Sequence, residues 1–153
     1  MQRAVQVLKR SRDEYYARRR MPERKPASCV IMVLVGYLSG ELPNGATIAD
    51  FLLRFSERAC AMLSSGPSSR ALENPVYNEN MIESWDDVDF EVFSLWTGEI
   101  AQNVVDLREG TPAKRGMAAE AVFGSKIGKK ALPASLAVAA APSIVTPSKP
   151  WAK

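Results

Sequence analysis

The sequence contains no histidine among its 153 residues. Histidine is the commonest general base near neutral pH and a frequent ligand of zinc and other metals. Its absence excludes Ser-His-Asp catalysis, Cys-His catalysis and histidine-based metal centres within this chain. Any chemistry here must depend on carboxylates, cations, hydroxyls or thiols.

Cysteine is also scarce. The two cysteines, Cys29 and Cys60, stand in apolar stretches and lack the close spacing of metal-binding pairs. Two thiols placed in this way do not build the disulfide framework of a small secreted domain. We therefore expect a reducing compartment and a cytoplasmic protein.

Long hydrophobic runs are missing as well. The nearly apolar run 27–38 has twelve residues, whereas a transmembrane helix needs about 20. The basic N-terminal segment is not followed directly by the apolar core of a signal peptide. We expect no membrane partner, and we expect the run to form a helix buried on most of its sides.

Charge is present but unevenly spread. Residues 1–26 hold nine Lys or Arg and three acids, residues 41–109 hold four and thirteen, and residues 125–153 hold five lysines and no acid. Basic ends around an acidic middle favour a polyanion as partner, either a nucleotide or a nucleic acid. The alternative is a charged surface that only faces water.

The apolar spacing predicts helices in the first half of the chain. A first helix runs from Met1 to about Arg19, and a linker between Pro22 and Pro26 precedes an apolar helix from Ser28 to near residue 40. A third helix follows the N-cap candidate Thr47 and ends near residues 64–67, at Ser-Ser-Gly-Pro. The expected inner face of the first helix consists of Met1, Ala4, Val5, Leu8 and Tyr15.

The second half continues with a polar loop to about Ser84 and a long helix from Trp85 through Leu107, whose first turn is acidic. A short helix covers residues 112–123 and ends at Gly124, because glycine favours helix ends. Residues 125–153 are rich in Ala, Pro, Ser and Lys, which predicts a loose tail with one short helix at 135–141. We therefore expect an all-α, bundle-like domain of four to five helices at residues 1–124, followed by a flexible tail.

Several short motifs occur in a characteristic order. They are Gln-Arg-Ala-Val-Gln-Val-Leu-Lys-Arg-Ser-Arg-Asp at 2–13, Lys-Pro-Ala-Ser at 25–28, Glu-Asn-Pro-Val at 73–76, Glu-Asn at 79–80, Trp85, and Ala-Val-Phe-Gly at 121–124. In this order they resemble the C-terminal helical half of the bacterial cGAS/DncV-like nucleotidyltransferases. That family makes cyclic oligonucleotide signals in the CBASS anti-phage defence.

The resemblance implies a set of nucleotide contacts. In the family, a lysine on the long helix and a serine that opens the next helix bind the nucleoside triphosphate; by position these are Lys9 and Ser28. Arg12 lies one turn after Lys9 and adds a fork-shaped donor to the same patch. Each of these two residues also has a purely structural alternative. Lys9 would form a surface ion pair with Asp13, and Ser28 would only cap the N-terminus of its helix.

The resemblance also implies what this chain does not supply. In the family, a Gly-Ser turn holds the triphosphate, and carboxylates on strands bind two Mg²⁺ ions. The sequence Asp87-Val88-Asp89 mimics such a carboxylate pair, but no Gly-Ser turn precedes it at short range. We interpret it as an acidic first turn of a helix, which the helix dipole favours. We therefore assign no catalytic and no metal-binding residue to this chain.

The expected partners are nucleoside triphosphates and a separate N-terminal catalytic half. The alternative function is a non-catalytic helical module that binds nucleic acid or a protein. Nucleic acid is the weaker of these two partners, because the basic residues are not interleaved with exposed aromatic residues. The aromatic residues Trp85, Trp96, Phe51 and Phe55 stand at helical spacing, which is typical of a core rather than of a base-stacking surface.

Overall fold

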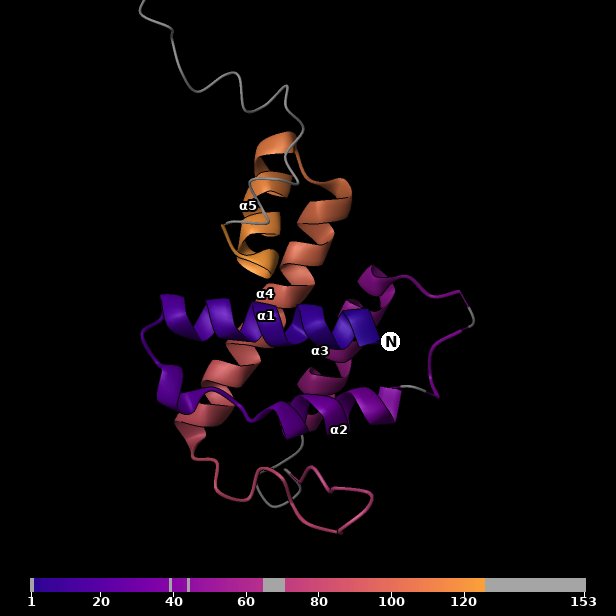
Figure 1. The fold of residues 1–153 in the computed structure, drawn as a ribbon, viewed down its shortest axis with the longest axis vertical. Coiled ribbons are helices and arrows are strands. Elements are labelled where there is room, and N and C mark those ends of the chain that lie inside the picture. Colours follow the sequence, from indigo (N-terminus) through magenta and orange to yellow (C-terminus); the bar gives the residue numbers. More distant parts are fainter. Residues whose placement is uncertain (1, 39, 44, 65–70, 126–153) are drawn as a thin grey trace, which may run out of the picture.

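The computed structural model describes residues 2–38, 40–43, 45–64 and 71–125, and every regular element within them is a helix (Figure 1). The expected all-α fold with four to five helices is confirmed. In chain order the elements are α1 (Gln2–Arg18), the 3₁₀ helix η1 (Pro22–Arg24), α2 (Ser28–Leu38), α3 (Ile48–Ser64), α4 (Asp87–Glu109) and α5 (Pro112–Phe123). Of the expected tail only Ser125 is described, and the short helix predicted at 135–141 lies outside the described residues.

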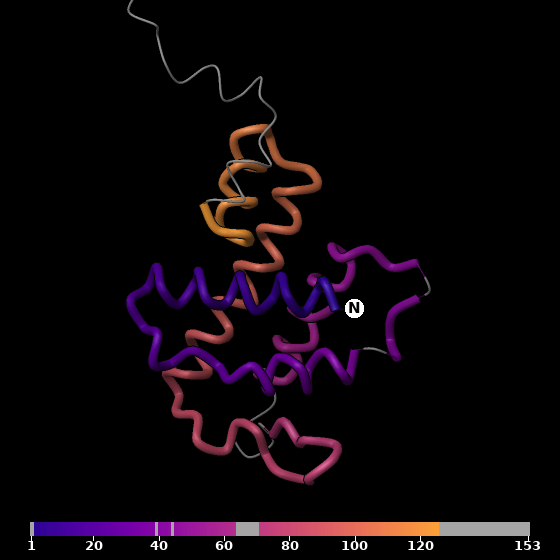
Figure 2. Tube along the Cα trace, viewed as in Figure 1, coloured from indigo at the N-terminus to yellow at the C-terminus, as the bar shows by residue number. Residues whose placement is uncertain are grey.

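Helix α1 crosses one side of the molecule, and the chain then reverses through η1 so that α2 runs back beside it (Figure 2). Arg20 has a φ of 58° at this reversal, in the left-handed region. Val5, expected on the inner face, is only half-buried. The buried residues of α1 are Ala4, Leu8, Ser11, Arg12, Tyr15 and Tyr16. Burial raises the pKa of both the Tyr15 and the Tyr16 hydroxyl above the ordinary value of tyrosine.

Helix α2 exposes more of its apolar side chains to solvent than its sequence predicts. Its inner face packs against α1 and α3 and consists of Val30, Ile31, Leu34, Val35 and Leu38. Its outer face is apolar too, but it is exposed: Met32 is 56% exposed and Tyr37 is 39% exposed. Seven of the eleven residues of α2 are buried or half-buried, so the expectation of a helix buried on most sides holds except along the outer face around Met32.

Helices α3 and α4 supply the centre of the core. Trp96 of α4 is fully buried, and its ring lies 5.8 Å from Phe55 of α3 and 5.4 Å from Phe93. Phe51 is buried as well, so the interpretation of these aromatic residues as core is confirmed. Trp85 is half-buried and precedes α4 instead of starting it.

The acidic motif lies in the first turn of α4, as the sequence predicts. Asp86 is the N-cap, and its side chain and that of Asp89 form a reciprocal capping box. The Asp89 carboxylate thus accepts from the Asp86 N–H, and the Asp86 carboxylate accepts from the Asp89 N–H, at a helix start where carboxylates are favoured. Arg24 of η1 donates to both carboxylates at 2.9 Å and so fixes the linker to α4.

Helix α5 folds back against α4 and the middle of α1 (Figure 1). It starts with the N-cap Thr111, whose hydroxyl accepts from the Lys114 N–H, and ends at Gly124 with a φ of +80°. Gly116, Ala118 and Ala119 are buried, and their small size lets the helices approach closely. None of the described helices combines the length and apolarity needed to cross a membrane.

Candidate triphosphate-binding site

Arg12 joins α1 to the start of α2 through its guanidinium group. The residue is only 6% exposed. Its Nη1 donates to the carbonyl of Pro26 at 2.8 Å and to the hydroxyl of Ser28 at 3.2 Å. Its Nε and Nη2 donate to Oδ1 of Asp13 at 3.1 and 2.9 Å. A buried guanidinium needs such partners, and arginine supplies five donors in a fixed fork.

Ser28 is the first residue of α2 and is half-buried. Its hydroxyl oxygen accepts from Arg12, so the hydroxyl proton remains able to donate to an anionic oxygen. The first backbone N–H groups of a helix add positive potential at the same place. The structure therefore brings together two of the three residues predicted to bind the triphosphate, Arg12 and Ser28.

Lys25 and Asp13 also belong to this cluster, and sequence reasoning missed both. The Lys25 ammonium lies 3.1 Å from Oδ1 of Asp13, the oxygen that Arg12 also binds. Partial burial alone would raise the pKa of Asp13, but hydrogen bonds from Lys25 and Arg12 outweigh it and hold that pKa below its ordinary value. Lys25 opens the motif Lys-Pro-Ala-Ser at 25–28, and its place in the same motif as Ser28 was the available signal.

Lys9 lies on α1 about one turn before Arg12 and Asp13 and is half-buried. The alternative in which Lys9 pairs with Asp13 is wrong, because Asp13 binds Arg12 and Lys25 instead. Within the described ranges, Lys9 forms no ion pair and no hydrogen bond with Ser28. Lys9 therefore lies on the same helix as Arg12 but takes no part in the hydrogen bond between Arg12 and Ser28.

The carboxylates of the chain do not fit a Mg²⁺ site. In residues 2–38, 40–43, 45–64 and 71–125, no three His, Cys, Asp or Glu side chains lie together as metal ligands would. Asp89 is committed to the capping box and to Arg24, and Asp87 follows the N-cap in the same helical turn. We therefore derive no reaction step through a metal ion on these residues.

No protein-family model matches this chain, and neither a curated protein nor a solved structure matches it. The resemblance to cGAS/DncV-like nucleotidyltransferases therefore stays a prediction from the order of the motifs. The roles of Lys9, Arg12 and Ser28 in triphosphate binding also stay predictions.

Proposed function

We propose that this chain is the helical part of a nucleotidyltransferase that makes cyclic oligonucleotides in bacterial antiviral defence. Its contribution is to bind the triphosphate of a nucleoside triphosphate, while a separate catalytic half supplies the Gly-Ser turn and the Mg²⁺ ligands. The observation that carries the proposal is the hydrogen bond between Arg12 and Ser28. The resemblance assigns Ser28 to the triphosphate, and the position of Arg12 one turn after Lys9 adds it to the same patch. The bond supports a shared site for Arg12 and Ser28, while the assignment of that site to a triphosphate depends on the order of the motifs.

The chemistry of the cluster suits a polyphosphate. Arg12 uses four of its donor contacts on Pro26, Ser28 and Asp13, so its main role is to position α2 and to add positive potential. Ser28 donates its hydroxyl proton to a phosphate oxygen. Lys25, with a side chain 38% exposed, moves from Asp13 to a second phosphate oxygen. A compact ammonium suits this role because it acts as a point charge.

Lys9 extends the same positive surface along α1, and the reach of its side chain lets the ammonium meet the distal phosphate. The two cysteines form no disulfide and are both exposed, which a reducing cytoplasm would maintain. We therefore propose a cytoplasmic location, where nucleoside triphosphates are abundant.

Calorimetric titration of the purified chain with ATP, GTP and inorganic tripolyphosphate tests the site. We expect saturable binding of all three. Lys9→Ala should weaken it about fivefold, which corresponds to the loss of roughly 1 kcal/mol for one charge contact. Ser28→Ala should weaken binding by a similar factor. Matched controls are Lys114→Ala and Ser84→Ala, which change exposed residues elsewhere and should leave the affinity unchanged. Equal losses in Lys9→Ala and Lys114→Ala would show a diffuse charge effect and contradict the site.

Two further measurements test the family itself. A Gly-Ser turn and an Asp-x-Asp strand encoded upstream of Met1 would support it, whereas an intact unrelated gene there would contradict it. Incubation of the chain with Mg²⁺ and nucleoside triphosphates should give no nucleotide polymerisation. Turnover that disappears in Asp87→Ala would overturn our interpretation of Asp87 and Asp89 as a helix start.

The alternative function is a non-catalytic module that binds a protein partner. The uncharged helix α2 favours it, because Met32 is 56% exposed on the outer, apolar face of this helix. Substitution Met32→Lys should then abolish association, measured by light scattering, and leave ATP affinity unchanged. A nucleic-acid partner would instead reveal itself by binding that weakens steeply with added salt.

A further inference from the structure

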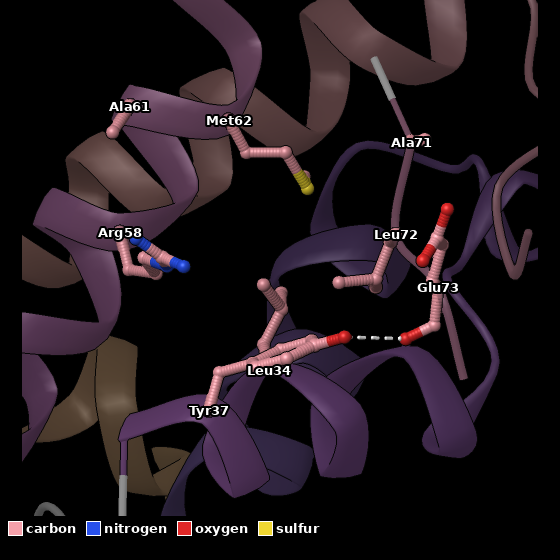
Figure 3. Close-up of a pocket in the computed structure, with 8 residues that line it drawn as sticks. All are labelled: Leu34, Tyr37, Arg58, Ala61, Met62, Ala71, Leu72 and Glu73. Atoms are coloured by element: carbon pink, nitrogen blue, oxygen red, sulfur yellow. Dashed lines mark hydrogen bonds between the residues drawn. The ribbon is translucent and has the colours of Figure 1, made fainter. Parts of the chain in front are cut away.

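A hollow opens between α2, α3 and the segment that begins at Ala71 (Figure 3). Its volume is about 490 Å³, within the range of small-molecule sites. Tyr37, which lines it, stands nine residues after Ser28 on α2, a separation of about 14 Å along the helix axis. The hollow is therefore distinct from the proposed triphosphate site.

The floor of the hollow is aliphatic and already ordered by the core. Leu34 of α2 is 2% exposed and Leu72 is 4% exposed, so both are held by packing from behind. Met62 of α3 points its thioether into the space from a third direction (Figure 3). Methionine adapts its shape easily, which favours contact with a flexible hydrocarbon chain.

A hydrogen bond fixes one wall. The Tyr37 hydroxyl donates to the backbone carbonyl of Glu73 at 2.9 Å (Figure 3). The next residues hold this wall in turn, because the N–H of Asn74 donates to the carbonyl of Glu79 at 2.8 Å. The wall formed by residues 72–73 is therefore tied to α2 and is not a free loop end.

The charged side chains stand on opposite walls. Arg58 of α3 is exposed and directs its guanidinium toward the hollow, with Glu73 on the far side (Figure 3). In the part of the chain that the structure describes, no carboxylate lies within ion-pair distance of Arg58. A guanidinium that has no carboxylate partner among the described residues, beside an aliphatic floor, marks the position for an acidic group on an apolar ligand.

We propose that this hollow binds an aliphatic monocarboxylate, with its carboxylate on Arg58 and its chain against Leu34, Met62 and Leu72. The planar guanidinium matches a carboxylate in bidentate geometry. Glu73 on the opposite wall repels a second acidic group, which selects a monoanion over a dicarboxylate or a polyphosphate. The occupant is a small acid and not a polypeptide.

Titration calorimetry with octanoate, octanol and acetate tests the site on the intact chain. We expect octanoate to bind and both reference ligands to bind more weakly, because octanol lacks the charge and acetate lacks the chain. Arg58→Gln should weaken octanoate about fivefold, toward the octanol value. The matched control is Arg54→Gln. Arg54 lies one turn before Arg58 on α3 and pairs with Glu57 instead of lining the hollow, so its substitution should not change binding.

A second variant keeps the proposal falsifiable from the apolar side. Ala61 lines the hollow and is exposed, so Ala61→Phe fills the space without removing a core side chain. This variant should abolish binding of octanoate and octanol alike, with unchanged thermal unfolding. Octanoate binding that survives in both Arg58→Gln and Ala61→Phe, or no saturable binding to the unmodified chain, would overturn the proposal.

Discussion

The indole Nε1 of Trp96 donates to the hydroxyl of Ser11 at 3.3 Å, inside the core and across 85 positions of sequence. Both residues are buried, Trp96 completely. The bond joins α4 to α1 at the point where the aromatic rings of three helices meet. Because an indole N–H can only donate, Ser11 is its acceptor and gives this polar group its place in an apolar core.

Ser11→Ala should lower the free energy of unfolding by about 1–3 kcal/mol, because it leaves the buried indole N–H without an acceptor. Urea denaturation followed by circular dichroism measures the loss. The control Ser94→Ala changes an exposed serine of α4 and should stay within about 0.5 kcal/mol. In the double variant with Trp96→Phe, the cost of removing Ser11 should shrink, and a fully additive result would contradict the hydrogen bond.

Two glycines of the helices should respond oppositely to alanine. Gly124 ends α5 with a φ of +80°, and a Cβ there would lie 2.6 Å from a Glu14 carboxylate oxygen. Gly124→Ala should therefore destabilise the chain by about 1–2 kcal/mol through backbone strain. Gly98 lies inside α4 with open space around it. Gly98→Ala should stabilise the chain by about 0.5–1 kcal/mol, and thermal unfolding of both variants checks the sign of each change.

Much of this fold follows from local signals in the sequence. The apolar spacing predicts α1 and α3, and the acidic turn at Asp87 and Asp89 predicts a helix start because carboxylates favour that end of the dipole. The start at Asp87 instead of Trp85 is a boundary effect, since Asp86 caps the helix and Trp85 packs its ring on Phe93. Local patterns do not say which elements cover a helix, and this is why the exposure of Met32 was not foreseen.

The candidate site was only partly predictable, because it depends on contacts between distant residues. Arg12 was expected to present its guanidinium to a ligand, yet most of its donors bind Pro26, Ser28 and Asp13. Helical spacing suggested Lys9 as the partner of Asp13. The reversal of the chain after α1 instead brings the Lys25 ammonium to 3.1 Å from the Asp13 carboxylate. Spacing along one helix cannot anticipate a partner that a loop delivers.

The ion pair between Asp86 and Arg24 should make stability depend on pH in the acid range. Hydrogen bonds from the Asp89 N–H and from Arg24 lower the pKa of Asp86 in the folded chain. The unfolded chain then binds the proton more readily, so this contribution is complete above about pH 5 and is lost as the pH falls below about 4. Asp86→Asn keeps the cap but removes the charge. The variant should therefore be less stable than the unmodified chain at pH 7, and the two stabilities should converge near pH 2.

Urea denaturation across that pH range measures the convergence. Arg24→Gln is the control, because it removes the partner and should reduce the effect of Asp86→Asn at pH 7. A difference between the unmodified chain and Asp86→Asn that stays constant from pH 7 to pH 2 would show that the charge on Asp86 contributes nothing. Asp50, whose pKa is lowered by hydrogen bonds from Thr47, adds a pH dependence of the same sign in both proteins.

Arg12 and Lys25 should separate the stability of the α1–α2 junction from phosphate binding. Arg12→Lys keeps the charge but cannot reach Pro26, Ser28 and Asp13 together, so it should cost about 1–3 kcal/mol of unfolding free energy. Lys25→Ala breaks only a solvent-exposed pair and should cost less than about 1 kcal/mol. The order reverses for function: Lys25→Ala should weaken tripolyphosphate binding about fivefold without altering the fold. If Lys25→Ala instead lowered stability and left tripolyphosphate affinity unchanged, Lys25 would be a structural partner of Asp13 alone.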